Sequence, residues 1–190
     1  MSAETLSAAA AVGTFIVITA TAIAALVQLR HMRTSNQIAA LTEFREAWES
    51  DRLTTERRCL DDCVNRISDP KVRQALMTRP LPAEYRPVLS IGNLFDNLGA
   101  FVRYGLIDAR LVCALWPRTI RYTWLQMQPV IAVLRRNNQG VFEHFEYLAI
   151  LVEDHMARHA SYAYPHDVRR LPMPDPWLEE DKAAGITPTS

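Results

Sequence analysis

Residues 8–27 of the chain read AAAAVGTFIVITATAIAALV, a run without a charged residue. At about 1.5 Å per residue, an α-helix of this length covers about 30 Å, the thickness of the hydrocarbon core of a membrane. The large apolar side chains of the run supply most of the favourable insertion energy. They are Val12, Phe15, Ile16, Val17, Ile18, Ile23, Leu26 and Val27. We therefore predict a transmembrane helix over residues 8–29, preceded by a short tail at residues 1–7.

A cleaved signal peptide is the alternative interpretation of this run. Ala20-Thr21-Ala22 fits the small-x-small pattern at which signal peptides are cut. However, the residues before the run include Glu4 and neither Lys nor Arg, whereas a signal peptide begins with a positive segment. The run is also longer than the apolar region of a usual signal peptide. These two departures favour an uncleaved membrane anchor.

The charges beside the run predict its orientation. Lys and Arg near a span stay on the cytoplasmic side, and here they follow the run, at Arg30, Arg33 and Arg45. The N-terminus is therefore expected outside and the remainder of the chain in the cytoplasm. The 3 cysteines agree with this placement. An odd number does not form a disulfide framework, and cytoplasmic thiols stay reduced.

We predict one all-α domain over residues 30–160, which includes a membrane-proximal stalk. Apolar residues recur at steps of three and four, and no segment alternates with the period of two that a half-buried strand requires. The spanning helix is expected to continue into the stalk through Ile38, Leu41, Phe44 and Trp48. The charged stretch from Asp51 to Arg58 is either a solvated part of a long helix or a break between two helices.

Capping residues divide the rest of the domain. Helices are expected to begin at Ser68-Asp69-Pro70, near Tyr85, after Asp108 and at Pro117. The helix from Tyr85 is expected to end at Gly105, where glycine supplies a left-handed conformation. We expect Pro129 to kink the helix that Pro117 opens. A last helix carries an apolar face from Phe142 to Met156.

The sequence of residues 161–190 is Pro-rich and acidic, and it predicts an extended arm. Proline removes backbone donors, so the segment cannot form a long helix. Its apolar side chains are candidate partner contacts, because a solvated linker does not need them. They are Leu171, Met173, Trp177 and Leu178. The arm is expected to lie either on this domain or on a partner.

Several short stretches resemble an uncharacterised bacterial family, domain of unknown function 4760. They are Val27-Gln28-Leu29-Arg30, the segment 93–99 (NLFDNLG), the segment 102–108 (VRYGLID), Arg135-Arg136, and the segment 144–148 (HFEYL). The resemblance extends from about Val12 to His155 and rests on packing and turn residues. It implies a membrane-anchored helical domain, in the inner membrane of a bacterium, and it implies no activity or catalytic residue.

Polar clusters are the candidate sites for chemistry. His155 and His159 stand four residues apart and are weak metal candidates, with an exposed polar helix end as the simpler interpretation. Cys59 and Cys63 lack a matching second pair of ligands. A third cluster is interpreted as ion pairs that fix helix packing, with a binding site as the alternative. It comprises Arg103, Asp108, Arg135, Glu143, His144 and Glu146.

These patterns favour a non-enzymatic interaction protein, an accessory or scaffold subunit of a membrane complex. No catalytic residue or cofactor is predicted. The formal net charge of +0 and the lack of a nucleic-acid motif argue against a nucleic-acid partner. The expected partners are the bilayer and a membrane protein complex or a second copy of the chain. A homo-oligomer predicts an exposed apolar stripe on Ile38, Leu41 and Trp48. The remaining alternative is a membrane-tethered enzyme, or a metal- or ligand-responsive effector, that uses the polar clusters.

Overall fold

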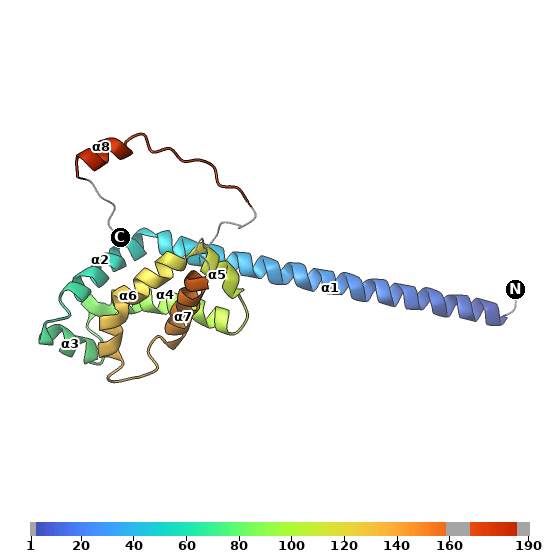
Figure 1. Ribbon diagram of the computed structural model, residues 1–190. Helices are drawn as coiled ribbons and strands as arrows, with labels where there is room; N and C mark the ends of the chain where they lie inside the picture. The colour runs from blue at the N-terminus through green and yellow to red at the C-terminus, as the bar shows by residue number, and fades with distance from the viewer. Residues whose placement is uncertain (1–2, 159–167, 186–190) are drawn as a thin grey trace.

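The computed structural model describes residues 3–158 and 168–185, with the backbone alone for residues 4–11. All regular structure in these ranges is helical, as predicted (Figure 1). The α-helices are α1 (Ala3–Glu49), α2 (Asp51–Asn65), α3 (Pro70–Met77), α4 (Arg86–Arg103), α5 (Ala109–Leu115), α6 (Pro117–Leu134), α7 (Glu143–Arg158) and α8 (Leu178–Ala183). A 3₁₀ turn, η1 (Ala83–Tyr85), precedes α4.

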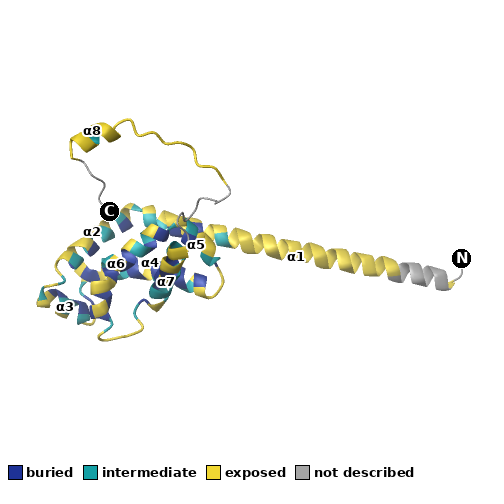
Figure 2. Cartoon of the chain, in the orientation of Figure 1, coloured by how far each residue is buried: buried dark blue, intermediate teal, exposed yellow. Residues whose placement is uncertain are grey.

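The helix α1 is a single rod of 47 residues that leaves the domain at one end (Figure 1). Its apolar part is bare, because none of the most hydrophobic stretch is buried by the rest of the chain (Figure 2). The eight apolar side chains expected in the anchor are 48% to 71% exposed. Among the described residues there is therefore one helix that is long and apolar enough to cross a membrane, as predicted.

The last part of α1 packs into the domain through an aromatic cluster. Phe44 is buried, and its ring lies 5.5 Å from the ring of Phe95 on α4 and 4.9 Å from that of Trp116. The ring of Phe95 in turn stacks on Phe145 of α7 at 4.8 Å. Because aromatic pairs at these distances bury large areas, they fix the rod to the core of the domain. The bare apolar part of α1 and the domain consequently share one continuous helix.

The charged stretch after α1 follows a break between two helices. Ser50 has an extended backbone, and its hydroxyl accepts a hydrogen bond from the backbone N–H of Leu53 at 3.2 Å, which caps α2. Of the two interpretations that the sequence left open, the break is the one observed. It lets α2 turn away from α1 and pack against α4 and α6.

The helices α4 and α7 share the most extensive contact among the described helices. At Gly99, an added β-carbon would overlap the backbone carbonyl of His144, and at Gly92 it would overlap the ring of Phe142. At Gly99 the obstacle is backbone, so only glycine fits there, whereas a larger residue at Gly92 would require the Phe142 ring to move. Phe142 has a φ of 57°, a left-handed conformation that is unfavourable for a non-glycine residue and is held here by packing.

The predicted caps are largely confirmed. Asp69 caps α3 and Asp108 caps α5, each by accepting a backbone hydrogen bond two residues on. Gly105 has a φ of 69°, as expected for the residue that closes α4. The proline at position 129 lies inside α6, which continues through it.

Candidate functional site

A groove runs between α1 and α4. It consists of three adjoining hollows of about 530, 190 and 640 Å³. Ala47, Leu94 and Asn97 line both the first and the second hollow, and Ala40 and Phe101 line both the second and the third. From α1, two small side chains seven residues apart, Ala40 and Ala47, line the groove. We call this feature the α1–α4 groove.

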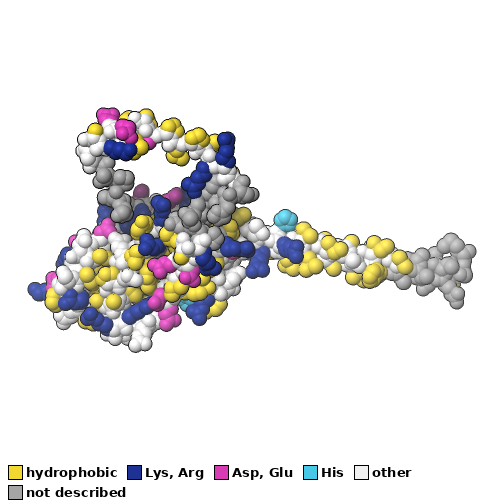
Figure 3. Space-filling model, in the orientation of Figure 1, with side chains coloured by type: hydrophobic (Ala, Val, Ile, Leu, Met, Phe, Trp, Pro, Cys, Tyr) yellow, Lys and Arg dark blue, Asp and Glu magenta, His cyan; other side chains and the backbone are white. Residues whose placement is uncertain are grey.

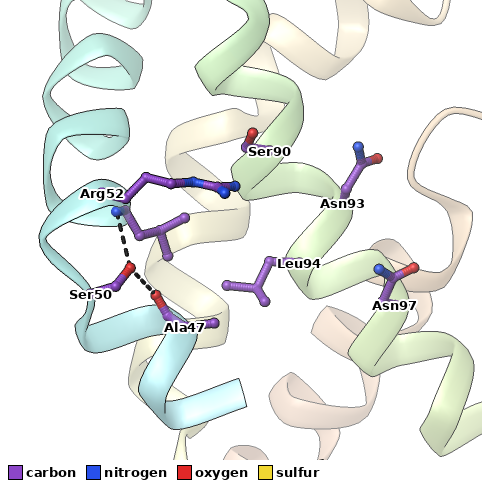
Figure 4. A pocket seen from close by; sticks show the side chains of 8 residues that line it. Ala47, Ser50, Arg52, Ser90, Asn93, Leu94 and Asn97 are labelled. Carbon is purple, nitrogen blue, oxygen red and sulfur yellow. Dashed lines mark hydrogen bonds between the residues drawn. The ribbon is translucent and has the colours of Figure 1, made fainter. Parts of the chain in front are cut away.

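The end of the groove far from the bare part of α1 is polar. Ser90, Asn93 and Asn97 line it from α4, and Arg52 lines it from α2 (Figure 4). Figure 4 shows Arg52 reaching across the hollow toward Ser90. The amides of Asn93 and Asn97 make no hydrogen bond within the described residues, so their donors and acceptors are available to a bound group.

The other end of the groove is mostly apolar and lies beside the bare part of α1. Leu29 and Met32 of α1 and Phe101 of α4 line it, together with the turn after α4. Arg33 fixes this end, because its Nη2 donates a hydrogen bond to the backbone carbonyl of Gly105 at 3.1 Å. The groove thus runs from an apolar end to a polar end.

The side chains that line the groove are suited to recognition. Glu43 is the one acidic side chain among the described lining residues, and these residues include neither His nor Cys. A nucleophile paired with a general base is therefore not assembled by the described lining. The amides, hydroxyls and guanidinium suit hydrogen bonding to a peptide or a small polar ligand.

A second polar feature lies where α7 begins, and its central residue is Asp96 of α4. Asp96 Oδ1 accepts hydrogen bonds from the backbone N–H groups of His144 and Phe145, both at 3.0 Å. Asp96 Oδ2 lies 3.6 Å from His144 Nδ1. This carboxylate therefore caps α7 from a residue 48 positions earlier in the chain.

The six polar residues predicted to act together are divided among several places. Arg135 and Glu146 form one ion pair at 2.7 Å, and Arg135 also donates to the backbone carbonyl of Val141 at 2.9 Å. His144 contacts Asp96, and Asp108 pairs with Arg110 at 3.0 Å. Arg103 and Glu143 are exposed. The predicted network is therefore not a single one. Two separate local contacts, Arg135–Glu146 and His144–Asp96, hold α7 instead.

The sequence-based search missed Asp96 and the polar lining of the groove. Ser90, Asn93 and Asn97 are spaced by three and four residues, which places a polar stripe on an otherwise apolar helix and was a detectable signal. Asp96 gave no such signal, because its role depends on α7, which follows it by about fifty residues in the chain.

The candidate metal site receives no support from the described residues. His155 lies on α7, whereas His159 lies outside the described residues. Within residues 3–158 and 168–185, no three His, Cys, Asp or Glu side chains are close enough to hold a metal ion. Cys63 and Cys113 are buried, and burial raises the pKa of both thiols, that of Cys63 to about 11.

The expected exposed stripe on the stalk is wrong at two of its three positions. Leu41 is buried, and Trp48 packs against Phe95 while Arg57 covers its ring at 4.5 Å. Leu41 therefore belongs to the core, and Trp48 is half-buried against it. Ile38 is 59% exposed, as predicted. Of the arm, the structure describes residues 168–185, in which Leu171, Met173, Trp177 and Leu178 are exposed and α8 forms a short helix.

A family model described as a domain of unknown function (DUF4760) matches residues 15–151. The chain belongs to this family. The DUF4760 match begins in the bare part of α1 and ends in α7, so it includes the α1–α4 groove and the contacts of Asp96. The arm lies outside the DUF4760 match. No curated protein and no solved structure matches the chain.

Proposed function

We propose that this DUF4760 protein is a single-span membrane protein whose cytoplasmic helical domain binds another protein, as an accessory or scaffold subunit of a membrane complex. The continuous helix α1 carries this proposal. It is bare over its apolar part and fixed to the core of the domain at its other end. A bare apolar helix of this length is costly in water and favourable in a bilayer.

The orientation rests on the charges that follow the apolar run. Arg30 and Arg33 come directly after it, and Lys and Arg near a span stay on the cytoplasmic side. The domain is therefore cytoplasmic, and its groove faces cytoplasmic partners. Free thiols at three positions agree with this reducing compartment.

The α1–α4 groove is the proposed docking site for the partner. Its apolar side chains supply contact area and its unpaired amides supply hydrogen bonds, the combination on which protein recognition relies. It lies beside the helix that continues into the membrane. A partner segment in this groove would be held next to the bilayer, where a subunit of a membrane complex works.

The test is site-specific photocrosslinking of the full-length protein in its native membrane. A photoreactive residue replaces Asn97 in the groove, and a matched variant carries it at Tyr122, an exposed position on α6. After mild detergent extraction, the crosslinked products and the particle mass are measured on the same sample. We expect one discrete protein adduct from position 97, none from position 122, and a particle heavier than the single chain.

A lone particle without an adduct at position 97 contradicts the proposal.

The same sample tests the second candidate function, a ligand-responsive effector. The hollow of about 530 Å³ at the polar end favours this candidate, because its volume suits a small molecule. Native mass spectrometry would then find a small ligand that the variant Asn93→Leu loses.

A further inference from the structure

The turn after α4 is held at a fixed height along the spanning helix. This turn comprises Tyr104, Gly105, Leu106 and Ile107, and we call it the 104–107 turn. The hydrogen bond from Arg33 to the carbonyl of Gly105 places it beside Arg33. Arg33 follows Leu29, the end of the predicted span, by four residues, which is about 6 Å along the helix axis. The headgroup layer extends about 5–8 Å beyond the hydrocarbon core on each side, so the turn lies at its depth.

The 104–107 turn and its surroundings expose large apolar side chains. Tyr104 is 70% exposed and Leu106 is 60% exposed, while Ile107 of the same turn is buried. Beside them, Leu29 and Met32 of α1 are both more than 60% exposed. Gathered apolar surface of this kind marks a contact site, and tyrosine prefers the boundary between membrane and water. The third hollow of the groove is bounded by these same side chains.

Positive charge surrounds the apolar side chains. Arg30, Arg33 and Arg103 are all exposed, and Figure 3 shows Lys and Arg side chains gathered where the bare helix meets the domain. The acidic residue next to the turn, Asp108, is already paired with Arg110. Guanidinium groups bind phosphate well, and anionic lipids attract basic residues close to the membrane surface.

We infer that the 104–107 turn is a second membrane contact, in which Tyr104 and Leu106 enter the headgroup region of the bilayer and Arg103 binds lipid phosphate. The surface is continuous with the membrane-spanning helix, and its charge complements anionic lipid. With two contacts, the domain is held at a fixed angle to the membrane, and the groove opens at the bilayer surface. This inference rests on the proposed membrane span of α1.

The test measures how deeply single labels lie in the membrane. The full-length protein carries Cys59→Ser, which leaves the two buried thiols, and an environment-sensitive fluorophore on one new cysteine. Leu106→Cys reports on the turn, Ile16→Cys on the span, and Gln74→Cys on α3, at the end of the domain opposite to the bare helix (Figure 1). The protein is reconstituted in vesicles of phosphatidylcholine and phosphatidylglycerol, with or without brominated acyl chains.

We expect brominated lipid to lower the emission of the labels at positions 16 and 106 by about half or more, because both positions then lie within reach of the bromines, and to leave position 74 unchanged. The variant Arg103→Glu should weaken quenching at position 106 and leave position 16 unchanged.

If position 16 is quenched and position 106 behaves like position 74, the inference is wrong while the anchor stands. If position 16 is not quenched, the proposed span fails. A label at position 106 that is shielded from water but not quenched means that protein, such as a second copy, covers the turn, and this also overturns the inference.

Discussion

Gly99 on α4 lies directly against the backbone carbonyl of His144 at the start of α7. The carbonyl belongs to the main chain and cannot rotate aside, so the space is available only to a residue without a side chain. Asp96, one turn earlier on α4, caps the same end of α7. The close contact and the cap together position α7 in the core.

The variant Gly99→Ala should therefore be strongly destabilising. Replacing a helical glycine by alanine normally stabilises by about 1 kcal/mol, but overlap with a fixed backbone atom outweighs this gain and costs about 3 kcal/mol or more. Thermal unfolding in detergent, followed by circular dichroism, measures the change. Gly140→Ala is the control, because its nearest atom is a side-chain oxygen at 3.4 Å. Equal melting temperatures for the two variants would contradict the packing described here.

Removing the carboxylate of Asp96 should loosen α7. Asp96→Ala leaves two backbone N–H groups without their acceptor, which is expected to lower the free energy of unfolding by about 1–2 kcal/mol. Asp96→Asn keeps an acceptor oxygen and should recover most of this loss. Glu143→Ala, at an exposed position of the same helix, serves as the control. The account fails if Glu143→Ala costs as much as Asp96→Ala.

The three cysteines should differ in reactivity. Burial, with a smaller contribution from Asp62, raises the pKa of the Cys63 thiol to about 11, whereas Cys59 is partly exposed. At pH 8 a thiol reagent should modify Cys59 first and reach Cys63 only after unfolding, because the thiolate is the reactive form. Mass spectrometry of the labelled peptides measures this order. Rapid labelling of Cys63 in the folded protein would contradict it.

Because of the same raised pKa, the free energy of unfolding should decrease at alkaline pH. The folded protein retains the Cys63 proton at pH values where the unfolded thiol, with a pKa near 9, has lost it. The contribution of this thiol to stability is therefore complete below about pH 9 and decreases as the pH rises toward 11. Cys63→Ala should reduce this decrease, which denaturation in urea between these pH values would detect.

Asp108 should contribute to stability with the opposite pH dependence. Its hydrogen bonds with Arg110 lower the pKa of its carboxyl below the ordinary value. The contribution is present above the unfolded pKa of about 4 and is lost as the pH falls below it. Asp108→Asn retains an acceptor for the cap, so its unfolding should be less sensitive to acid than that of the wild type. Identical acid profiles would show that the Arg110 pair adds nothing at this partly exposed site.

Local signals in the sequence predict the helices well. The apolar run at residues 8–27, the caps at Asp69 and Asp108 and the closing residue Gly105 each act within a few residues, so their effects can be inferred from neighbouring positions. The break at Ser50 could not be decided, because a charged helix is compatible with either continuation or a break.

Contacts between distant segments could not be predicted. Trp48 looks like an exposed stalk residue until Phe95 and Arg57 are placed against it, and Leu41 does so until the domain buries it. Asp96 looks like an ordinary polar residue until α7 begins beside it. Ala40 and Ala47 line the groove together with residues of α4, and periodicity alone does not show which helix a face meets. Candidate sites therefore required the tertiary structure, whereas the fold class did not.

The central claim is that α1 crosses the membrane and leaves the domain in the cytoplasm. Cysteine accessibility in intact cells tests it most directly, with Glu4→Cys and Gln74→Cys placed separately in the Cys59→Ser background. A membrane-impermeant maleimide should label position 4 in intact cells and position 74 only after permeabilisation. Labelling of both positions under the same condition would show that α1 does not cross the membrane and would contradict the claim. The reverse pattern would contradict the cytoplasmic placement of the domain.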